Sequence, residues 1–230
     1  MTLKPVEKGC AVLWDMDGVL VDTGEFHYLT WKEMLELNGI PFSRQDFQHT
    51  FGMNNGQVVT CVLGHPPDPE LLKEISDRKE ENFREMVREQ AEINPGVRAL
   101  LEQLHDAGIK QAIASSAPQE NIDQVVDKLK IRGFFSAMVS GDCLPSKPDP
   151  TVFRLAAQEL GVSPGNCIVV EDAKAGVDAA RRAGMKCIAV AATHPVDELD
   201  QADLAVQNLE TLSIDDFHQL FYNKLLEEKC

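Results

Sequence analysis

The sequence lacks any long apolar run, and no stretch approaches the ~20 residues that a membrane-spanning helix requires. The polar start MTLKPVEKG also lacks the apolar core of a secretory signal peptide. No internal repeat or low-complexity tract is present. These absences argue against a helical membrane protein and against a repeat architecture, and we expect the protein to be soluble and cytoplasmic.

Positive charge is scarce. The 230 residues include 22 Lys and Arg against 37 Asp and Glu, which gives a formal net charge of −15. Such a surface repels nucleic acids and anionic membranes at long range, so neither is an expected partner. Some of the acids should instead hold a cation, and the acidic surface favours a monomer. With 43% apolar and 26% charged residues, the composition is that of an ordinary packed domain.

The six cysteines, at positions 10, 61, 143, 167, 187 and 230, form no CxxC pair and no zinc-ligand spacing. Three of them lie within or beside apolar runs that resemble strands. We therefore expect reduced cysteines in the core rather than disulfides or a zinc site.

The apolar pattern divides the chain into helical and alternating parts. A short apolar run, Ala11 to Trp14, predicts a buried strand. Helical spacing follows as far as residue 91, with a serine cap at Ser43, and predicts a bundle without a strand. Beyond residues 94–96 the pattern alternates, which predicts a parallel sheet with helices on both faces. The expected helices there are 97–107, 119–129, 150–160, 173–183 and 213–226, and the strands are 111–115, 137–140, 167–171, 187–190 and 204–206.

The first strand has no crossover helix of its own, so the helical bundle is most simply an insertion. The predicted fold is therefore α/β, a Rossmann-like parallel-sheet core with an inserted helical domain. Residues 1–22 and 93–230 form the predicted core, and residues 23–92 form the predicted insertion.

Two acids, Asp15 and Asp17, follow the first predicted strand, and Gly18 lets the chain turn there. Open α/β sheets bind ligands at this edge. A fixed carboxylate can be a nucleophile that forms an acyl phosphate, while a second acid protonates the leaving group and later activates water. A simple acidic turn is the alternative interpretation of this fragment alone.

Polar residues also end or follow later strands. Ser115 and Ser116 can bind a phosphate or form a turn. Lys147, in SKPDP, can neutralise a transferred phosphoryl group or be solvated. Glu171 and Asp172 end another strand. Four carboxylates beside one lysine would repel one another unless a cation joined them, and all-oxygen ligation suits Mg²⁺.

The stretch DMDGVLVDT resembles the first motif of the haloacid dehalogenase superfamily of phosphotransferases. Ser115, Lys147 in its KPDP context and the pair Glu171-Asp172 match the second, third and fourth motifs in order. The resemblance spans nearly the whole chain, and it implies that Asp15 is the nucleophile and Asp17 the acid/base.

The same resemblance implies a set of Mg²⁺ ligands. They are the Asp15 side chain, the Asp17 backbone carbonyl and the Asp172 side chain, with Glu171 binding the ion directly or through water. Asp17 also favours phosphate over halide chemistry, because dehalogenases do not need a leaving-group acid there.

The helical insertion resembles the small cap domain of this superfamily, with hinges at Asp22 to Gly24 and Asn94 to Gly96. The stretch EFHYLTWK looks particularly like the β-phosphoglucomutase group, in which the cap histidine matching His27 lies near the acid/base aspartate. His27 can equally be a helix-surface or core histidine. Trp31, one turn later, is more typical of a core residue than of a ligand.

Those mutases carry a cap arginine, three residues after a loop glycine, that binds the phosphate not being transferred. Here Gly52 is followed by MNN, so the uncharged Asn55 occupies that position. Lys79 matches a cap lysine of the mutases, or else lies on a solvated helix face. The residues thus expected to contact substrate are His27, Trp31, Gly52, Asn55, Lys79 and Ser116.

Loss of a bidentate arginine weakens the grip on a bisphosphate intermediate. The sequence therefore predicts a Mg²⁺-dependent phosphatase for a small phosphate monoester, above all a sugar phosphate. One alternative is β-phosphoglucomutase or a related sugar-phosphate mutase. Another is a non-catalytic phosphoacceptor module like a response-regulator receiver, although receivers are about half this length, lack a cap and carry their acidic pair before the phosphorylated aspartate.

Overall fold

The computed structural model describes residues 9–192 and 195–227. Its centre is a parallel sheet with the strand order β3-β2-β1-β4-β5-β6. The strands are β1 (Ala11–Trp14), β2 (Lys110–Ser115), β3 (Ala137–Ser140), β4 (Cys167–Glu171), β5 (Lys186–Val190) and β6 (Leu204–Val206). Strand β1 pairs with both β2 and β4, so the strand order reverses there. A crevice forms outside the carboxyl ends of the strands at such a switch point.

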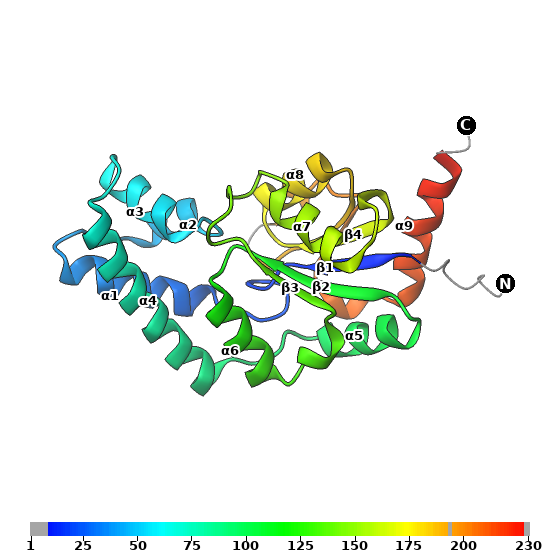
Figure 1. Ribbon diagram of the computed structural model, residues 1–230, viewed down its shortest axis with the longest axis horizontal. Coiled ribbons are helices and arrows are strands. Elements are labelled where there is room, and N and C mark those ends of the chain that lie inside the picture. The colour runs from blue at the N-terminus through cyan, green and yellow to red at the C-terminus, as the bar shows by residue number, and fades with distance from the viewer. Residues whose placement is uncertain (1–8, 193–194, 228–230) are drawn as a thin grey trace.

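Helices cover both faces of the sheet (Figure 1). Val12 and Trp14 of β1 belong to the cluster formed with α5 (Val97–Asp106), α6 (Gln119–Leu129) and α9 (Ile214–Glu227). Ala11 and Leu13 pack on the opposite face with α7 (Thr151–Leu160) and α8 (Lys174–Ala183). Because both faces of β1 are buried, its sequence is a continuous apolar run rather than an alternating one.

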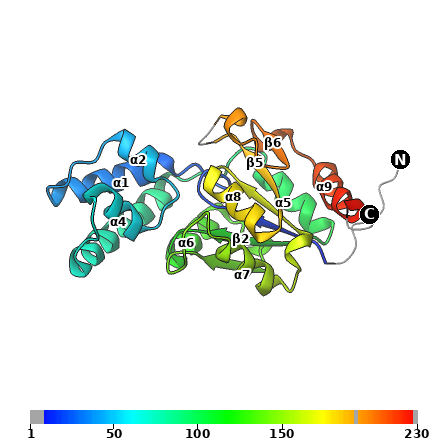
Figure 2. The ribbon, with the colours of Figure 1, turned by 90° about the horizontal axis from the view of Figure 1, so that it is seen from above.

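Helices α1 (Gly24–Leu37), α2 (Arg44–Thr50), α3 (Asn55–Leu63) and α4 (Pro69–Gln90) lie together at one end of the molecule (Figures 1 and 2). They share a small core that includes Trp31 and Leu35. The second half of α4 differs, because Phe83 and Val87 pack into the cluster beneath the sheet. Helix α4 therefore belongs to the helical group at one end and contacts α6 at the other.

Local capping explains where the helices of this group begin. Ser43 forms a capping box with Asp46 at the start of α2. The Asn54 side chain accepts a hydrogen bond from the Gln57 N–H and starts α3, and Asp68 caps α4 ahead of Pro69. The serine cap expected at Ser43 is confirmed.

The order of strands and helices expected from the sequence is confirmed, and each observed strand begins within one residue of its expected start. None of the helices described here combines the length and apolar character needed to cross a membrane. The division into domains at residues 22/23 and 92/93 stays a prediction.

The expectation that the cysteines lie in the core is wrong for Cys61 and Cys143, which are exposed. Cys61 lies on α3 and Cys143 in the loop after β3, and both side chains are exposed to solvent. Cys167 and Cys187 are buried as expected, and Cys10 is partly buried. Cys230 lies outside the described residues.

Candidate active site

Asp15, Lys147 and Glu171 meet at the carboxyl edge of the sheet. The Lys147 Nζ lies 2.5 Å from the Asp15 Oδ1 and 2.5 Å from the Glu171 Oε1. The side chains of Lys147, Asp15 and Glu171 are 6%, 10% and 2% exposed. The ammonium therefore bridges two carboxylates, one directly after β1 and one at the end of the adjacent strand β4. The solvated-lysine interpretation of SKPDP is wrong.

A potential metal site lies beside this lysine. One carboxylate oxygen each from Asp15, Glu171 and Asp172 can be chosen so that all lie within 4.8 Å of one another, and the three residues are buried. Burial raises the pKa of Asp15 to about 7; the Lys147 charge opposes this rise and the Glu171 charge adds to it. A divalent cation would supply the missing positive charge, and the all-oxygen donor set fits a hard ion such as Mg²⁺.

Two glycines let these carboxylates approach. A Cβ on Gly18, whose φ is +83°, would overlap the Asp172 carboxylate, and a Cβ on Gly176 of α8 would overlap that of Glu171. Glu171 is held further by its Oε2, which accepts hydrogen bonds of 2.8 Å from the N–H groups of Asp172 and Ala173. The turn at Gly18 was expected, but the close approach of the Glu171 carboxylate to Gly176 was not.

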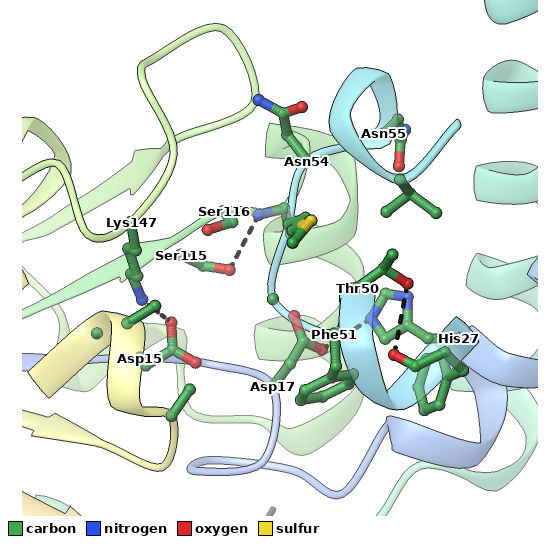
Figure 3. A pocket seen from close by; sticks show the side chains of 18 of the residues that line it. Asp15, Asp17, His27, Thr50, Phe51, Asn54, Asn55, Ser115, Ser116 and Lys147 are labelled. Atoms are coloured by element: carbon green, nitrogen blue, oxygen red, sulfur yellow. Dashed lines mark hydrogen bonds and ion pairs between the residues drawn. The ribbon is translucent and has the colours of Figure 1, made fainter. Parts of the chain in front are cut away.

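Asp17 points away from Lys147 toward α1 (Figure 3). Its Oδ1 accepts a hydrogen bond from the Thr23 hydroxyl and lies 3.3 Å from the His27 Nε2. Burial by itself would raise the pKa of Asp17, but His27 and Thr23 outweigh this effect and hold the pKa below its ordinary value. Sequence reasoning missed Thr23, although it is the last residue of the first motif.

Lys79 reaches this region from α4. Its Nζ lies 3.0 Å from the His27 Nδ1 and 5.1 Å from the centre of the Trp31 ring, and Lys79 is 2% exposed. The His27 ring stacks on Phe83 with a centroid distance of 4.1 Å. The solvated interpretation of Lys79 is therefore wrong, and His27 lies beside Asp17 as the resemblance implied. Trp31 belongs mainly to the core of the helical group, as expected.

One cavity of about 420 Å³ connects the sheet edge with the helical group. It is lined from the sheet side by Asp15, Asp17, Ser115, Ser116, Lys147, Glu171 and Asp172 and from the helical side by His27, Trp31, Gly52, Asn55, Lys79 and Glu80. The structure thus brings every predicted site residue to the same cavity. Glu80 is a lining residue that sequence reasoning missed, because nothing local marks it among the many acids of α4.

The two ends of the cavity differ in their polar groups. The buried Ser115 Oγ accepts a hydrogen bond of 3.1 Å from the Ala117 N–H, which fixes the turn after β2 (Figure 3). At the far end the Asn55 Nδ2 donates to the Glu80 Oε1 at 2.9 Å. Asn55, which the resemblance matches to the cap arginine of the mutases, is therefore an amide that contacts a carboxylate.

Comparison with known proteins relates this site to one family. The model of the haloacid dehalogenase-like hydrolases matches residues 12–190. A chloroplastic 5-amino-6-(5-phospho-D-ribitylamino)uracil phosphatase of Arabidopsis thaliana is 32% identical over 98% of this chain, which spans 62% of that protein. The β-phosphoglucomutase of Bacillus subtilis is 32% identical over 91% of this chain and 94% of its own.

The solved structures agree with the sequence relatives. The crystal structure of β-phosphoglucomutase from Clostridium difficile superposes with a TM-score of 0.84 at 25% identity, over 94% of this chain and 98% of that one. The fold, the four motifs at the strand ends and the loop beside them, and these matches lead to one conclusion. The chain belongs to the family of haloacid dehalogenase-like hydrolases.

Proposed function

We propose that this enzyme is a Mg²⁺-dependent phosphatase that hydrolyses a small phosphate monoester, with sugar phosphates as the preferred class. The observation that carries the proposal is the buried Asp15 carboxylate beside Lys147 and two further carboxylates in the cavity. Such a group is desolvated, oriented and close to positive charge, as a nucleophile toward phosphorus must be.

In the proposed reaction an Asp15 carboxylate oxygen attacks phosphorus while the ester oxygen departs, which leaves an aspartyl phosphate. Lys147 and the hydroxyls of Ser115 and Ser116 bind the other phosphate oxygens. Asp17 gives its proton to the departing alkoxide. It then takes a proton from the water that releases inorganic phosphate and restores Asp15. Its lowered pKa favours the ionised form, which is the form that takes the proton from water.

The proposed Mg²⁺ site uses the carboxylates of Asp15, Glu171 and Asp172 with the backbone carbonyl of Asp17. When bound, the ion neutralises charge on the carboxylates and on the phosphate. Lys147 is already paired with Asp15 and Glu171, so the protein by itself provides part of this neutralisation.

Residues 23–92 are proposed to act as the cap that closes the cavity and excludes water, with residues 1–22 and 93–230 as the core. The hinge at 94–96 is tied to the first motif, because the Asn94 Nδ2 donates to the carbonyls of Gly18 and Val19 at 3.2 and 2.9 Å. His27, Trp31, Gly52, Asn55 and Lys79 are the proposed cap contacts of the substrate.

A sugar-phosphate mutase is the second candidate, because a phosphatase and a mutase are equally similar to this chain. The contact between Asn55 and Glu80 favours the phosphatase. A bisphosphate would place its second phosphate against an uncharged amide and a buried carboxylate, where nothing in that contact compensates its charge.

Release of inorganic phosphate from a panel of sugar phosphates and other small monoesters tests the proposal. The panel includes β-glucose 1-phosphate with and without glucose 1,6-bisphosphate, and each assay is run with Mg²⁺ and with chelator. We expect Mg²⁺-dependent phosphate release. Formation of glucose 6-phosphate without release, dependent on the bisphosphate, would show a mutase instead.

A further inference from the structure

Glu80 is a buried carboxylate that the proposed reaction does not use. It lies on α4 next to Lys79 and is 5% exposed. Its Oε1 accepts hydrogen bonds of 2.9 Å from the Lys79 Nζ and from the Asn55 Nδ2, and its Oε2 accepts one of 2.6 Å from the Asn121 Nδ2. Burial by itself would raise the pKa of Glu80, but Lys79 and Asn121 hold it below its ordinary value. The group is therefore a fully partnered anion.

The contacts of Lys79 connect this anion with Asp17. An ammonium group only donates hydrogen bonds, so the Lys79 Nζ must donate to the His27 Nδ1 at 3.0 Å. A neutral His27 then carries its proton on Nε2, which lies 3.3 Å from the Asp17 Oδ1. The position of the Lys79 ammonium thus selects the His27 tautomer that donates to Asp17.

Asn121 connects the Glu80 carboxylate with the sheet-side part of the fold. It lies on α6 and is completely buried, and while its Nδ2 donates to Glu80, its Oδ1 accepts a hydrogen bond of 3.1 Å from Arg84. Further along, Lys128 of α6 donates to the Arg88 carbonyl at 2.6 Å. The Glu80 carboxylate therefore accepts hydrogen bonds from side chains of three helices, α3, α4 and α6. Of these, α6 packs against the sheet.

We propose that Glu80 is a positioning residue for the acid/base Asp17 and that Asn121 anchors it to the core. Glu80 holds the Lys79 ammonium against His27, and His27 then donates from Nε2 to Asp17. The hydrogen bond from Asn121 to Glu80 links the Glu80–Lys79–His27 chain to the packing of α4 on α6. Asp17 is therefore oriented when the helical and sheet sides of the cavity are packed together. The inference rests on the proposed function, since it assigns Asp17 the acid/base role.

The substitution Glu80→Gln tests the inference, because it keeps the side-chain shape and removes the charge that holds Lys79. The value of kcat/KM is measured for an alkyl phosphate from the panel and for p-nitrophenyl phosphate. An alkoxide needs a proton to leave, whereas nitrophenolate leaves without one. We expect kcat/KM to fall about 10-fold or more for the alkyl phosphate and much less for p-nitrophenyl phosphate.

A merely structural role predicts an equal loss for both substrates, and that result would overturn the inference. Glu81→Gln is the matched control, because Glu81 is the exposed neighbour of Glu80 on the same helix. It should leave both values unchanged. Thermal unfolding of each variant reports whether the fold is retained.

A charge exchange across the contact gives a second test that does not require Glu80→Gln to be fully stable. Asn121→Asp alone places two carboxylates 2.6 Å apart in the geometry of the present bond and should lower kcat/KM for the alkyl phosphate. In the double variant E80Q/N121D the new amide at position 80 can donate a hydrogen bond to the new carboxylate at position 121, which restores a donor and an acceptor to the contact. We expect it to recover part of the loss seen in each single variant, and additive losses would contradict the role of Asn121.

The His27 ring gives a readout that is independent of turnover. Two-dimensional ¹H–¹⁵N NMR of the ring nitrogens, assigned through His27→Gln, should show a single tautomer protonated at Nε2 in the wild type and a mixture in E80Q. The same single tautomer in both would overturn the inference. Should the wild type release phosphate from no substrate, the proposed function fails and the NMR result still decides the role of Glu80.

Discussion

The two walls of the cavity differ in how their charges are balanced. On the sheet side, Asp15, Glu171 and Asp172 converge and Lys147 pairs with two of them, so the wall carries excess negative charge. On the helical side, the charges of Lys79 and Glu80 compensate one another. The sheet wall is thus suited to a cation and a phosphate, and the helical wall to an uncharged, hydrogen-bonding group.

Their origin in the chain differs as well. The sheet wall uses residues at strand ends, whose positions are fixed by the register of neighbouring parallel strands. The helical wall uses contacts between helices, such as Glu80 with Asn121 of α6. The proposed chemistry therefore rests on strand ends whose positions the sheet fixes, while the proposed substrate contacts rest on packing between helices.

Removal of the proposed nucleophile should have the largest effect. Asp15→Asn leaves the shape of the sheet wall intact but cannot form an aspartyl phosphate, so we expect kcat to fall about 10³-fold or more. Phosphate release measures the loss, and circular dichroism checks the fold. Substantial activity in this variant would show that Asp15 is not the nucleophile.

Metal removal should act on the same wall. We expect chelation to abolish phosphate release and added Mg²⁺ to restore it, because three carboxylates then lack their cation. Since burial raises the pKa of Asp15 to about 7, protons compete with the ion, and the apparent Mg²⁺ affinity should increase as the pH rises through about 7. Calorimetric titration at several pH values checks this, and full activity with chelator would contradict the site.

Lys79→Met breaks the charge balance of the helical wall. It leaves the Glu80 carboxylate buried without its counter-ion, and we expect the free energy of unfolding to fall by about 3–5 kcal/mol. Lys73→Met on the same helix is the matched control, because the Lys73 side chain is 77% exposed and should contribute little. Equal unfolding midpoints in urea for the two variants would show that Lys79 does not stabilise the buried Glu80 carboxylate.

Gly176→Ala tests how closely the sheet wall is packed. The new Cβ would overlap the Glu171 carboxylate, and we expect Mg²⁺ affinity to fall about 10- to 100-fold as that group is displaced. Gly56→Ala in α3 is the control, since its Cβ would have neighbours at 3.7 and 3.8 Å, an ordinary contact distance. Unchanged affinity in Gly176→Ala would show that the Glu171 carboxylate can move freely.

The smallest effect should come from the helical group away from the cavity. Ser43→Ala removes the acceptor for the Asp46 N–H at the start of α2 and should cost about 1 kcal/mol of stability. Mg²⁺ affinity should not change, because the sheet wall is untouched. A parallel loss of Mg²⁺ affinity would mean that the two walls are more strongly coupled than their separate contacts indicate.

Much of the sheet wall could be predicted from the sequence. Short apolar runs marked the strands, carboxylates and serines marked their ends, and a lysine marked the loop before the next helix. Asp15, Lys147 and Glu171 could therefore be expected at one edge before any geometry was known. The exceptions there were Thr23 and Gly176. The role of Thr23 depends on its contact with Asp17, and that of Gly176 on its contact with Glu171. Spacing along the chain does not reveal either contact.

The helical wall could be predicted only where the resemblance supplied His27, Trp31, Gly52, Asn55 and Lys79. The burial of Lys79 and the contacts of Glu80 could not be predicted. Helix α4 is rich in charged residues, and its hydrophobic periodicity does not show which of them are buried. The exposed Cys61 and Cys143 show the converse, since the apolar character of cysteine did not imply burial.

The sequence by itself determined the order of strands and helices, the edge at which the reactive groups gather and the family to which the chain belongs. The physical reason is that these follow from local periodicity and from the common direction of parallel strands. The tertiary structure decided the partners of Glu80, which lie 25 and 41 positions away at Asn55 and Asn121. Contacts of that kind arise from how α3, α4 and α6 pack together, and no local pattern encodes them.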